Sequence, residues 1–467
     1  SVRQGPDECG DLIEDVLPDV LRCRCKLVQA RYAYENIHFP SDFGALELAR
    51  QRFIFEEFFV LACALSKMRG ERVEQGGIVM DGADAEEFFA SLPFPPTGAQ
   101  RRAVAQAIDD MRSGRVMNRL LQGDVGSGKT LVAAALIWYV WKCGFTSAFM
   151  APTEILAEQH FMTLSSLFTP FGLRIARLTG AMTAKEKREV KAALAAGSID
   201  LIVGTHALFS TDVEYSRLGL VVTDEQHRFG VAQRSALIGK GQKPHVLVMS
   251  ATPIPRTLAL IIYGDLDVSV LDELPPGRQK VDTFAVGESY RARLNNFIRR
   301  LVGEGRQVFV VCPMVEENDE LPVKLKSAEE HAKELTAAFP DLRVGCVHGR
   351  MKAKDKDRVM ADFAAGELDI LVSTTVIEVG VDVPNAALMI VENAERFGLS
   401  QLHQLRGRVG RGQHKSYCVL VSDADGEEVK SRLGIMVKTN DGFKISEEDL
   451  RLRGPGDFFG SRQHGLP

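Results

Sequence analysis

A glycine-rich stretch that ends in lysine and threonine has the clearest chemical meaning in this sequence. Gly123-Asp-Val-Gly-Ser-Gly128-Lys129-Thr130 fits the pattern G-x-x-x-x-G-K-[ST], between a predicted strand and a predicted helix. Its glycines let backbone N–H groups turn toward phosphate oxygens at a helix N-terminus. The Lys129 ammonium can then hold the β- and γ-phosphates, and the Thr130 hydroxyl can ligate Mg²⁺. We expect this phosphate-binding loop to contact a nucleoside triphosphate through Gly123, Gly126, Ser127, Gly128, Lys129 and Thr130.

Two carboxylates follow the fourth predicted strand. Asp224 and Glu225 stand where the apolar run 218–223 ends, and ligands of open α/β sheets bind at the carboxyl ends of strands. Phosphoryl transfer needs a metal clamp and a positioned nucleophile. We expect Asp224 to hold Mg²⁺ and Glu225 to orient or deprotonate the attacking water. A solvated acidic turn is the alternative, and the nearby phosphate-binding loop argues against it.

A glycine-rich loop late in the chain carries the opposite charge. Residues 396–415 contain five Lys and Arg, two His and no Asp or Glu, so nothing close in the sequence neutralises them. A phosphate held by another part of the molecule is the natural partner, and an arginine finger is worth about 10³ to 10⁵ in rate. The alternative is a solvated basic loop, or plain contact with a nucleic-acid backbone.

Short apolar strands alternate with longer helical segments from about residue 119 to residue 421, which is typical of parallel α/β sheets. The predicted strands are 119–122, 147–151, 201–204, 218–223 and 246–250, then 308–312, 344–348, 370–373, 387–391 and 417–421. Residues 272–278 separate the two series, because their Pro-Pro-Gly stops helix and strand alike. The predicted fold class is therefore α/β, with two tandem parallel-sheet lobes.

The ends of the chain differ from the lobes. Apolar residues at helical spacing over 44–69 predict one long amphipathic helix, and 427–438 predicts a helix before a glycine-rich tail. We expect four segments, with an N-terminal linker and long helix at 1–92 and an ATP-binding first lobe at 93–273. A second lobe at 274–424 and a C-terminal helical segment at 425–467 complete the chain.

Composition excludes several classes of protein. The 467 residues are 45% hydrophobic and 25% charged, as in ordinary folded proteins. The net charge of −5 gives no overall basic field, so contact with nucleic acid must be local. No apolar run is long enough to span a bilayer, and the eight cysteines lack a CxxC pair, which indicates reduced thiols. We expect a soluble, intracellular protein without membrane contact.

The acidic pair lies in Asp224-Glu-Gln-His227, which resembles the Walker-B signature of the superfamily 2 helicases. Further signatures of that superfamily follow in the right order: 151–159 for motif Ia, 204–206 for Ib, 250–252 for III, 373–382 for V and 404–411 for VI. The resemblance implies two RecA-like lobes that close on ATP, with Arg408 and Arg411 reaching it. Gln100 resembles the Q motif that reads adenine with both faces of its amide; a polar residue at an ordinary helix N-terminus is the alternative.

The same resemblance implies residues at the nucleotide and along a DNA path. Gly380 and Asp382 would lie at the nucleotide. The DNA-binding and coupling candidates are Thr153, Thr205, His206, His227 and Thr252 in the first lobe, with His348, Gly349, Thr375 and Gln404 in the second. Hydroxyl and N–H groups of this kind contact phosphates without reading bases. Binding should therefore be independent of sequence and sensitive to salt.

The surrounding sequence is more specific. Residues 117–130, 224–231 and 250–257 resemble the RecG family of bacterial branched-DNA translocases, as do 36–40 and the helix after them. The tail at 449–465 resembles the translocation motif shared by RecG and the transcription-repair coupling factor Mfd, which follows a helical hairpin. Arg451, Arg453 and Gln463 are the residues that this motif implies, and a charged helix end is the alternative.

The resemblance implies an ATP-dependent helicase, an ATP hydrolase that moves along double-stranded DNA at forks and Holliday-type junctions in recombination, repair and fork rescue. ATP and Mg²⁺ are the implied cofactors, and single-strand-binding protein is a further partner of a monomer in the bacterial cytoplasm, associated with the nucleoid. The family's N-terminal wedge domain and its C-terminal end are not found in the sequence, so we expect a motor portion impaired in junction unwinding. An Mfd-like translocase, an RNA helicase and a non-catalytic DNA-binding module are the alternatives.

Overall fold

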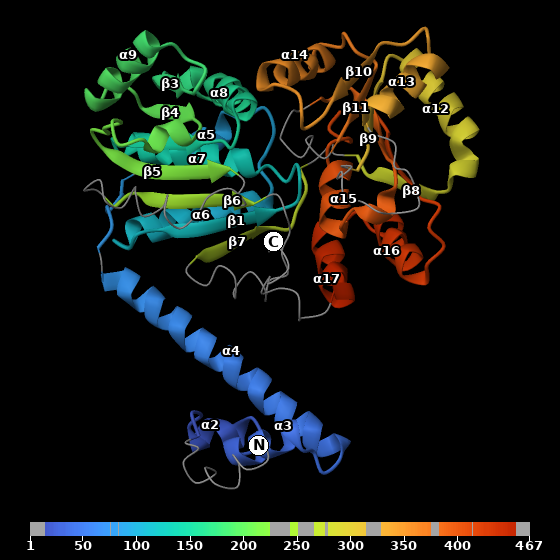
Figure 1. The fold of residues 1–467 in the computed structure, drawn as a ribbon. Helices are drawn as coiled ribbons and strands as arrows, with labels where there is room; N and C mark the ends of the chain where they lie inside the picture. Colours follow the sequence, from blue (N-terminus) through green and yellow to red (C-terminus); the bar gives the residue numbers. More distant parts are fainter. Residues whose placement is uncertain are drawn as a thin grey trace. The chain divides into compact units, whose positions relative to one another are not determined.

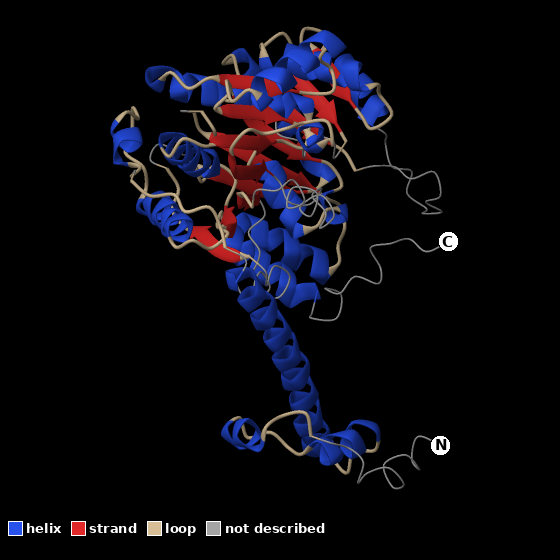
Figure 2. Ribbon diagram, turned by 90° about the vertical axis from the view of Figure 1, so that its left-hand side faces the viewer, coloured by secondary structure: helices blue, strands red, loops and turns tan. Residues whose placement is uncertain are grey.

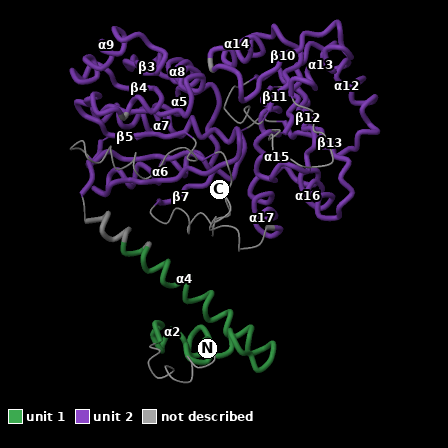
Figure 3. The backbone as a smooth tube through the Cα atoms, in the orientation of Figure 1, with its two compact units in different colours: residues 1–75, 257–265 green, residues 76–256, 266–467 purple. Residues whose placement is uncertain are grey.

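The computed structural model describes residues 15–74, 76–82, 84–224, 243–250, 266–275, 279–313, 328–374, 383–412 and 414–453. It divides into two compact units, residues 1–75 with 257–265, and residues 76–256 with 266–467 (Figure 3). Among the described residues, no helix is long and apolar enough to cross a membrane. The seven cysteines in the described ranges are all free thiols.

The smaller unit consists of α2 (Asp19–Arg24), α3 (Ala30–His38) and α4 (Phe43–Glu74). Helix α4 packs against α3 with the small side chains of Ala45 and Ala49 and with the fully buried Arg52. Leu48, Ile54 and Phe58 of α4 are 42 to 51% exposed. The expected long helix is present, and its packed face combines Ala45, Ala49 and Arg52 with the half-buried Phe53, whose ring lies edge-on to Tyr34 of α3 at a centroid separation of 4.8 Å.

The larger unit contains two separate parallel sheets (Figure 1). The first sheet has the order β3-β4-β2-β5-β6-β1-β7 and the second has the order β10-β11-β9-β12-β13-β8. The strands of the first are β1 (Asn118–Gly123), β2 (Thr146–Met150), β3 (Ile175–Leu178), β4 (Leu201–Gly204), β5 (Leu218–Asp224), β6 (His245–Ser250) and β7 (Asp267–Leu271). Those of the second are β8 (Val281–Val286), β9 (Gln307–Val311), β10 (Val344–Val347), β11 (Ile370–Ser373), β12 (Ala386–Val391) and β13 (Ser416–Val421). We refer to each sheet with its helices as the first and the second lobe.

Helices flank the strands on both sides (Figure 2). The first lobe has α5 (Glu86–Ala90), α6 (Gly98–Arg112), α7 (Lys129–Lys142), α8 (Glu154–Phe168) and α9 (Ala184–Ala195), with short 3-10 helices η2 (Thr169–Phe171) and η3 (His206–Phe209). The second has η5 (Glu288–Tyr290), α12 (Arg291–Gly303), α13 (Ala328–Ala338), α14 (Ala353–Ala364), η7 (Ala394–Arg396), α15 (Leu399–Arg406), α16 (Glu427–Lys438) and α17 (Gly442–Arg453). Helices α16 and α17 pack on each other and on α15. The expected α/β fold, with a C-terminal helical hairpin, is confirmed.

Alternate side chains of the central strands fill different cores, because successive residues of a strand point to opposite faces. Phe149 of β2 belongs to the core under α6 and α7, whereas Ala148 and Met150 belong to the core that includes α9. In β9, Phe309 packs with α14 and α15, whereas Val308 packs with α12 and α13. Both faces of each sheet are therefore covered, which explains the nearly continuous apolar strands in the sequence.

A buried carboxylate follows β12 in the second lobe. Glu392 is 6% exposed and pairs with Arg291 through two contacts of 2.6 and 2.7 Å, and its Oε1 lies 3.3 Å from His331 Nε2. Burial acts to raise the pKa of this carboxyl, but the partner groups Arg291 and His331 outweigh it and lower the pKa to about 2. Ionised Glu392 thus contributes to the stability of this lobe.

We predict that Glu392→Gln lowers the free energy of unfolding of this lobe by about 3 kcal/mol at neutral pH, because Arg291 loses its buried partner. A depressed carboxyl pKa stabilises the fold above the unfolded value of 4.5, and this stabilisation is lost as the pH falls toward 2. Denaturant unfolding at several pH values measures the effect, with the exposed Glu304→Gln as control. A wild-type advantage that stays constant down to about pH 3 would contradict this role.

Candidate functional site

The phosphate-binding loop connects β1 to α7, and two of its glycines have left-handed backbones. Gly126 and Gly128 have φ angles of 78° and 84°, which favour glycine because it has no Cβ. A Cβ at Gly128 would also collide with the amide nitrogen of Gln100. The curvature of the loop at the start of α7 therefore depends on glycine at these two positions.

Gln100 holds this loop. It is 2% exposed, its Nε2 donates to the Ser127 carbonyl at 2.9 Å, and its Oε1 accepts from the Thr97 backbone N–H at 2.9 Å. The Thr97 side chain in return accepts from the Gln100 backbone, which makes a capping box at the start of α6. Both ends of the amide therefore bind the protein itself in this structure, and the reading of adenine by Gln100 stays a prediction.

Other groups of the loop fit a phosphate ligand. The Ser127 hydroxyl is buried and has no hydrogen-bond partner among the described residues. Lys129 Nζ donates to the carbonyl oxygens of Gly123 at 2.7 Å and Asp124 at 2.9 Å, so its charge lies over the loop. Thr130, the second residue of α7, is half-buried. These donors suit the phosphates of a nucleotide, and the Thr130 hydroxyl suits a magnesium ion beside them.

Asp224 is the last residue of β5 and shares the carboxyl edge of the first sheet with the loop. Its Oδ2 lies 2.7 Å from Nε2 of His160 in α8. Burial acts to raise the pKa of Asp224, but His160, Lys129 and Arg408 outweigh it, and the pKa lies below its ordinary value. Asp224 is therefore ionised, the state in which a carboxylate binds Mg²⁺.

Helix α15 of the second lobe lies against the phosphate-binding loop of the first. His403 Nε2 is 2.6 Å from Asp124 Oδ1, and a Cβ at Gly407 would lie 2.8 Å from the Val125 Cβ. Arg408, only 8% exposed, is close enough for its charge to act on Asp224 across the lobes. Arg408 therefore follows the helix that contacts the phosphate-binding loop, and its charge is one of the causes that lower the pKa of Asp224.

Arg406 continues this contact into the helical hairpin. Its Nη2 lies 2.9 Å from His403 Nδ1, and its Nη1 donates to the carbonyls of Met436 at 2.7 Å and Thr439 at 2.9 Å. A chain of hydrogen bonds therefore runs from Asp124 through His403 and Arg406 to the end of α16. Sequence analysis did not single out any of these three residues.

The remaining residues of the basic loop have different partners. Arg411 Nε donates to the Gly407 carbonyl at 3.2 Å, and Lys415 forms an exposed ion pair with Asp282 at 2.8 Å. Gln404 is half-buried on α15. Arg408 of this loop is one of the groups whose charge lowers the pKa of Asp224 at the end of β5.

The predicted DNA-path residues lie after strands of both sheets. Thr153 follows β2 and caps α8, accepting from the Leu156 N–H at 3.4 Å. His206 follows β4 and is exposed, but Thr205 is only 3% exposed. The strand end buries Thr205, and its contact with DNA stays a prediction.

In the second lobe, His348 and Gly349 follow β10. His348 Nε2 lies 3.0 Å from Glu329 Oε1, and Gly349 is exposed, with its carbonyl accepting from Lys356 at 2.8 Å. Arg451 on α17 is 75% exposed at its side chain and pairs with Glu448 at 2.8 Å. Arg453 is the last residue of α17. Predicted residues outside the described ranges are Glu225, His227, Thr252, Thr375, Gly380, Asp382 and Gln463.

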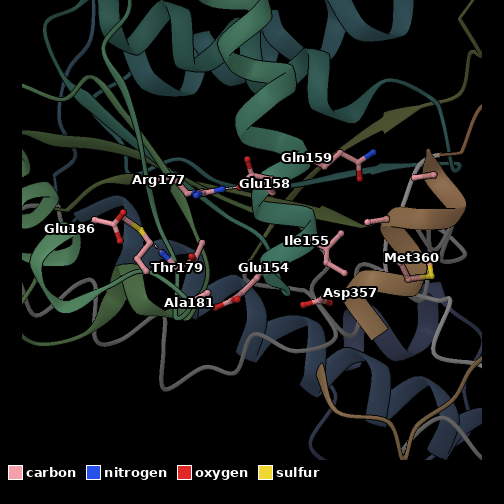
Figure 4. Close-up of a pocket in the computed structure, with 13 residues that line it drawn as sticks. Glu154, Ile155, Glu158, Gln159, Arg177, Thr179, Ala181, Glu186, Asp357 and Met360 are labelled. Carbon is pink, nitrogen blue, oxygen red and sulfur yellow. Dashed lines mark hydrogen bonds and ion pairs between the residues drawn. The ribbon is translucent and has the colours of Figure 1, made fainter. Parts of the chain in front are cut away.

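A further cavity, of about 670 Å³, lies between α8 and α14. Figure 4 shows Glu154, Glu158 and Gln159 of α8 on one side and Asp357 and Met360 of α14 on the other. Burial and the charge of Glu154 raise the pKa of Asp357. None of the predicted catalytic residues in the described ranges lines the cavity, and two acidic groups of different lobes, Glu154 and Asp357, face it.

Two parallel-sheet lobes that meet at a phosphate-binding loop are the arrangement of the helicase fold. Residues 97–261 match the DEAD/DEAH box helicase family, residues 291–413 match the Helicase conserved C-terminal domain, and residues 439–467 match ATP-dependent DNA helicase RecG, domain 3, C-terminal. The last match covers α17, the second helix of the hairpin, and the predicted translocation motif.

Whole-chain comparisons agree with these matches. The chain is 52% identical to ATP-dependent DNA helicase RecG of Thermotoga maritima, covering 99% of this chain and 59% of that protein. It is 48% identical to RecG of Bacillus subtilis, covering 100% of this chain and 69% of that protein. A solved structure of RecG bound to a three-way DNA junction matches with a TM-score of 0.83 and 48% identity, covering 97% of this chain and 60% of that one. The chain belongs to the RecG family, and it spans little more than half the length of the Thermotoga relative.

Proposed function

We propose that this chain is an ATP hydrolase that moves along double-stranded DNA at forks and Holliday-type junctions, in recombination, repair and replication-fork rescue. The single observation that carries the proposal is the contact of α15 in the second lobe with the phosphate-binding loop of the first, where His403 Nε2 lies 2.6 Å from Asp124 Oδ1 and the buried Arg408 follows the helix. Family membership supports it, since the names of the relatives describe an ATP-dependent DNA helicase.

The geometry suggests a role in ATP binding and hydrolysis for each residue of the site. Lys129 would exchange its loop carbonyls for the β- and γ-phosphates, and the unpartnered Ser127 hydroxyl would bind the same ligand. Thr130 and Asp224 would hold Mg²⁺, which neutralises phosphate charge when bound. Arg408 would stabilise the charge that develops on the transferred phosphoryl group, so hydrolysis and the approach of the lobes are linked.

Movement of the second lobe would reach DNA through the hairpin. Arg406 ties α15 to the end of α16, and α17 leads into the predicted translocation motif with Arg451, Arg453 and Gln463. Thr153, His206, Thr252, His348, Gly349 and Thr375 would contact DNA phosphates, and Glu225 would position the attacking water. We take 93–273 and 274–424 as the two lobes, 1–92 as the linker with its helix, and 425–467 as the hairpin and motif.

The biological setting is proposed on the same basis. A monomer in the bacterial cytoplasm, associated with the nucleoid and in contact with single-strand-binding protein, fits a protein that acts on branched DNA. The membership of the RecG family favours this setting over a transcription-coupled or RNA-directed role.

Steady-state ATPase assays test the proposal. We expect turnover to rise at least several-fold with duplex DNA and further with a three-way fork, because DNA contact on both lobes favours their closed arrangement. A single-stranded RNA of the same length is the matched control. Stimulation by RNA equal to that by the fork would contradict the DNA-specific function, and absence of turnover under all conditions would contradict ATP hydrolysis.

A further inference from the structure

Helix α8 extends from the proposed DNA contact to the proposed magnesium site. Its N-cap, Thr153, follows β2 at the edge where DNA contact is proposed. Two turns further along the same helix, His160 touches Asp224, the proposed magnesium ligand. One rigid element therefore extends from the DNA path to the metal site.

The contact with Asp224 is short and enclosed. His160 Nε2 lies 2.7 Å from Asp224 Oδ2, with side-chain exposures of 11% for the histidine and 19% for the aspartate. A hydrogen bond to an ionised group in such surroundings is about twice as strong as one between neutral groups. It commits Oδ2 to the protein and fixes the orientation of the carboxylate.

The ring that makes this contact is itself held. It packs on Phe149 of β2 with a centroid separation of 4.5 Å. On either side along α8, the buried Leu156 and Leu164 fix the helix on the sheet. Because His160 cannot rotate without losing these contacts, a shift of α8 would move the imidazole and with it the Asp224 carboxylate.

We propose that His160 is a positioning residue that couples the DNA-contact end of α8 to the orientation of Asp224 at the magnesium site. This inference rests on the proposed function. DNA at the N-terminus of α8 adjusts the helix, His160 passes the adjustment to Asp224, and the magnesium-nucleotide complex binds more tightly. Ligands of bound metals commonly depend on such hydrogen-bonded partners, whose loss costs about 10- to 100-fold in metal affinity.

The alternative is a histidine that merely fills and satisfies the core under α8. That role predicts a loss of thermal stability on substitution, without a selective change toward magnesium. The two roles are therefore separated by comparing nucleotide binding with and without the metal, and with and without DNA.

The variants His160→Phe and His160→Leu both remove the N–H donor, and His160→Phe keeps a ring against Phe149. His160→Gln keeps a donor, and Leu164→Ala loosens the packing of α8 without touching Asp224. Melting temperatures identify which variants fold. The affinity of a fluorescent ADP analogue is then measured in excess Mg²⁺ and in a chelator, each with and without duplex DNA.

We expect the donor-less variants to lose about 10-fold or more of the magnesium-dependent part of the affinity. Affinity in chelator should stay within about two-fold of wild type, the gain on adding DNA should vanish, and His160→Gln should restore part of both effects. Equal loss in Leu164→Ala, or unchanged magnesium and DNA dependence in the donor-less variants, would overturn the inference alone. A wild-type chain that shows no magnesium-dependent nucleotide binding would overturn the proposed function as well.

Discussion

Lys129→Ala should reduce ATP turnover by at least about 100- to 1,000-fold, the scale on which enzymes lose a group that stabilises developing charge. Lys129 is the first residue of α7 and its Nζ lies over the loop, bonded to the Gly123 and Asp124 carbonyls. Alanine favours helices, so the variant should keep α7 and the first sheet intact. Steady-state ATPase with saturating duplex DNA measures the effect.

Lys185→Ala is the matched control for this prediction. Lys185 lies on α9 of the same lobe, is 77% exposed and pairs only loosely with Glu189 at 4.0 Å. The control should turn over ATP like the wild type, since exposed ion pairs contribute little. If Lys129→Ala kept more than about a tenth of the wild-type turnover, the loop would not act on the phosphates in the way that P-loop lysines do.

The central strands of both sheets were predictable because both of their faces are buried. All ten predicted strands are present within one or two residues. The strands β3, β7 and β8 were missed, and they are three of the four edge strands of the two sheets; the fourth, β10, was predicted. The run Val281-Asp-Thr-Phe-Ala-Val286 shows the reason, since only Val281 and Thr283 in it are buried. An edge strand faces solvent and does not show the apolar run that identifies a central one.

Only the separate motifs of the candidate site could be predicted from the sequence, and not the contacts between them. The loop, the acidic strand end and the basic loop are local patterns, but their pairing depends on the order of strands and on the approach of the lobes. Asp124 and His403 are separated by 279 positions in the sequence. His160 lies in a helix whose sequence gives no sign that it faces Asp224. Such contacts follow from the packed structure and not from spacing.

The role of Gln100 in a capping box was not predicted, although the sequence contains a signal for it. Thr97-x-x-Gln100 ahead of an apolar helix is the pattern of a capping box, and the structure shows that box together with the contact of Gln100 to Ser127. The basic loop held no such signal for Arg406, which holds the hairpin, because the resemblance to motif VI pointed only to Arg408 and Arg411. Both arginines are buried, and their partners in the structure separate them.

Arg408→Ala should lower kcat by about 10³- to 10⁵-fold, which is the range for arginine fingers in phosphoryl transfer. The expected loss is this large because Arg408 is buried and its charge already acts on Asp224 across the lobes. Arg408→Lys should restore little, since an ammonium lacks the planar fork of a guanidinium. Single-turnover hydrolysis measures the chemical step, and binding of a fluorescent ADP analogue should change only a few-fold because ADP lacks the γ-phosphate.

Lys415→Ala provides the control from the same basic loop. Its side chain is 63% exposed and pairs with Asp282 of the same lobe, so its removal should leave the chemical step near the wild-type rate.

A further variant, Arg406→Ala, separates the chemical step from its coupling to DNA. It should release the end of α16 and weaken stimulation by DNA more than it weakens basal hydrolysis. If Arg408→Ala lost no more rate than Lys415→Ala, the arginine near Asp224 would serve the contact between the lobes and not the reaction. If both variants behave as expected, the two neighbouring arginines act in different steps of the ATPase cycle: Arg408 acts on the phosphate, and Arg406 acts on the hairpin.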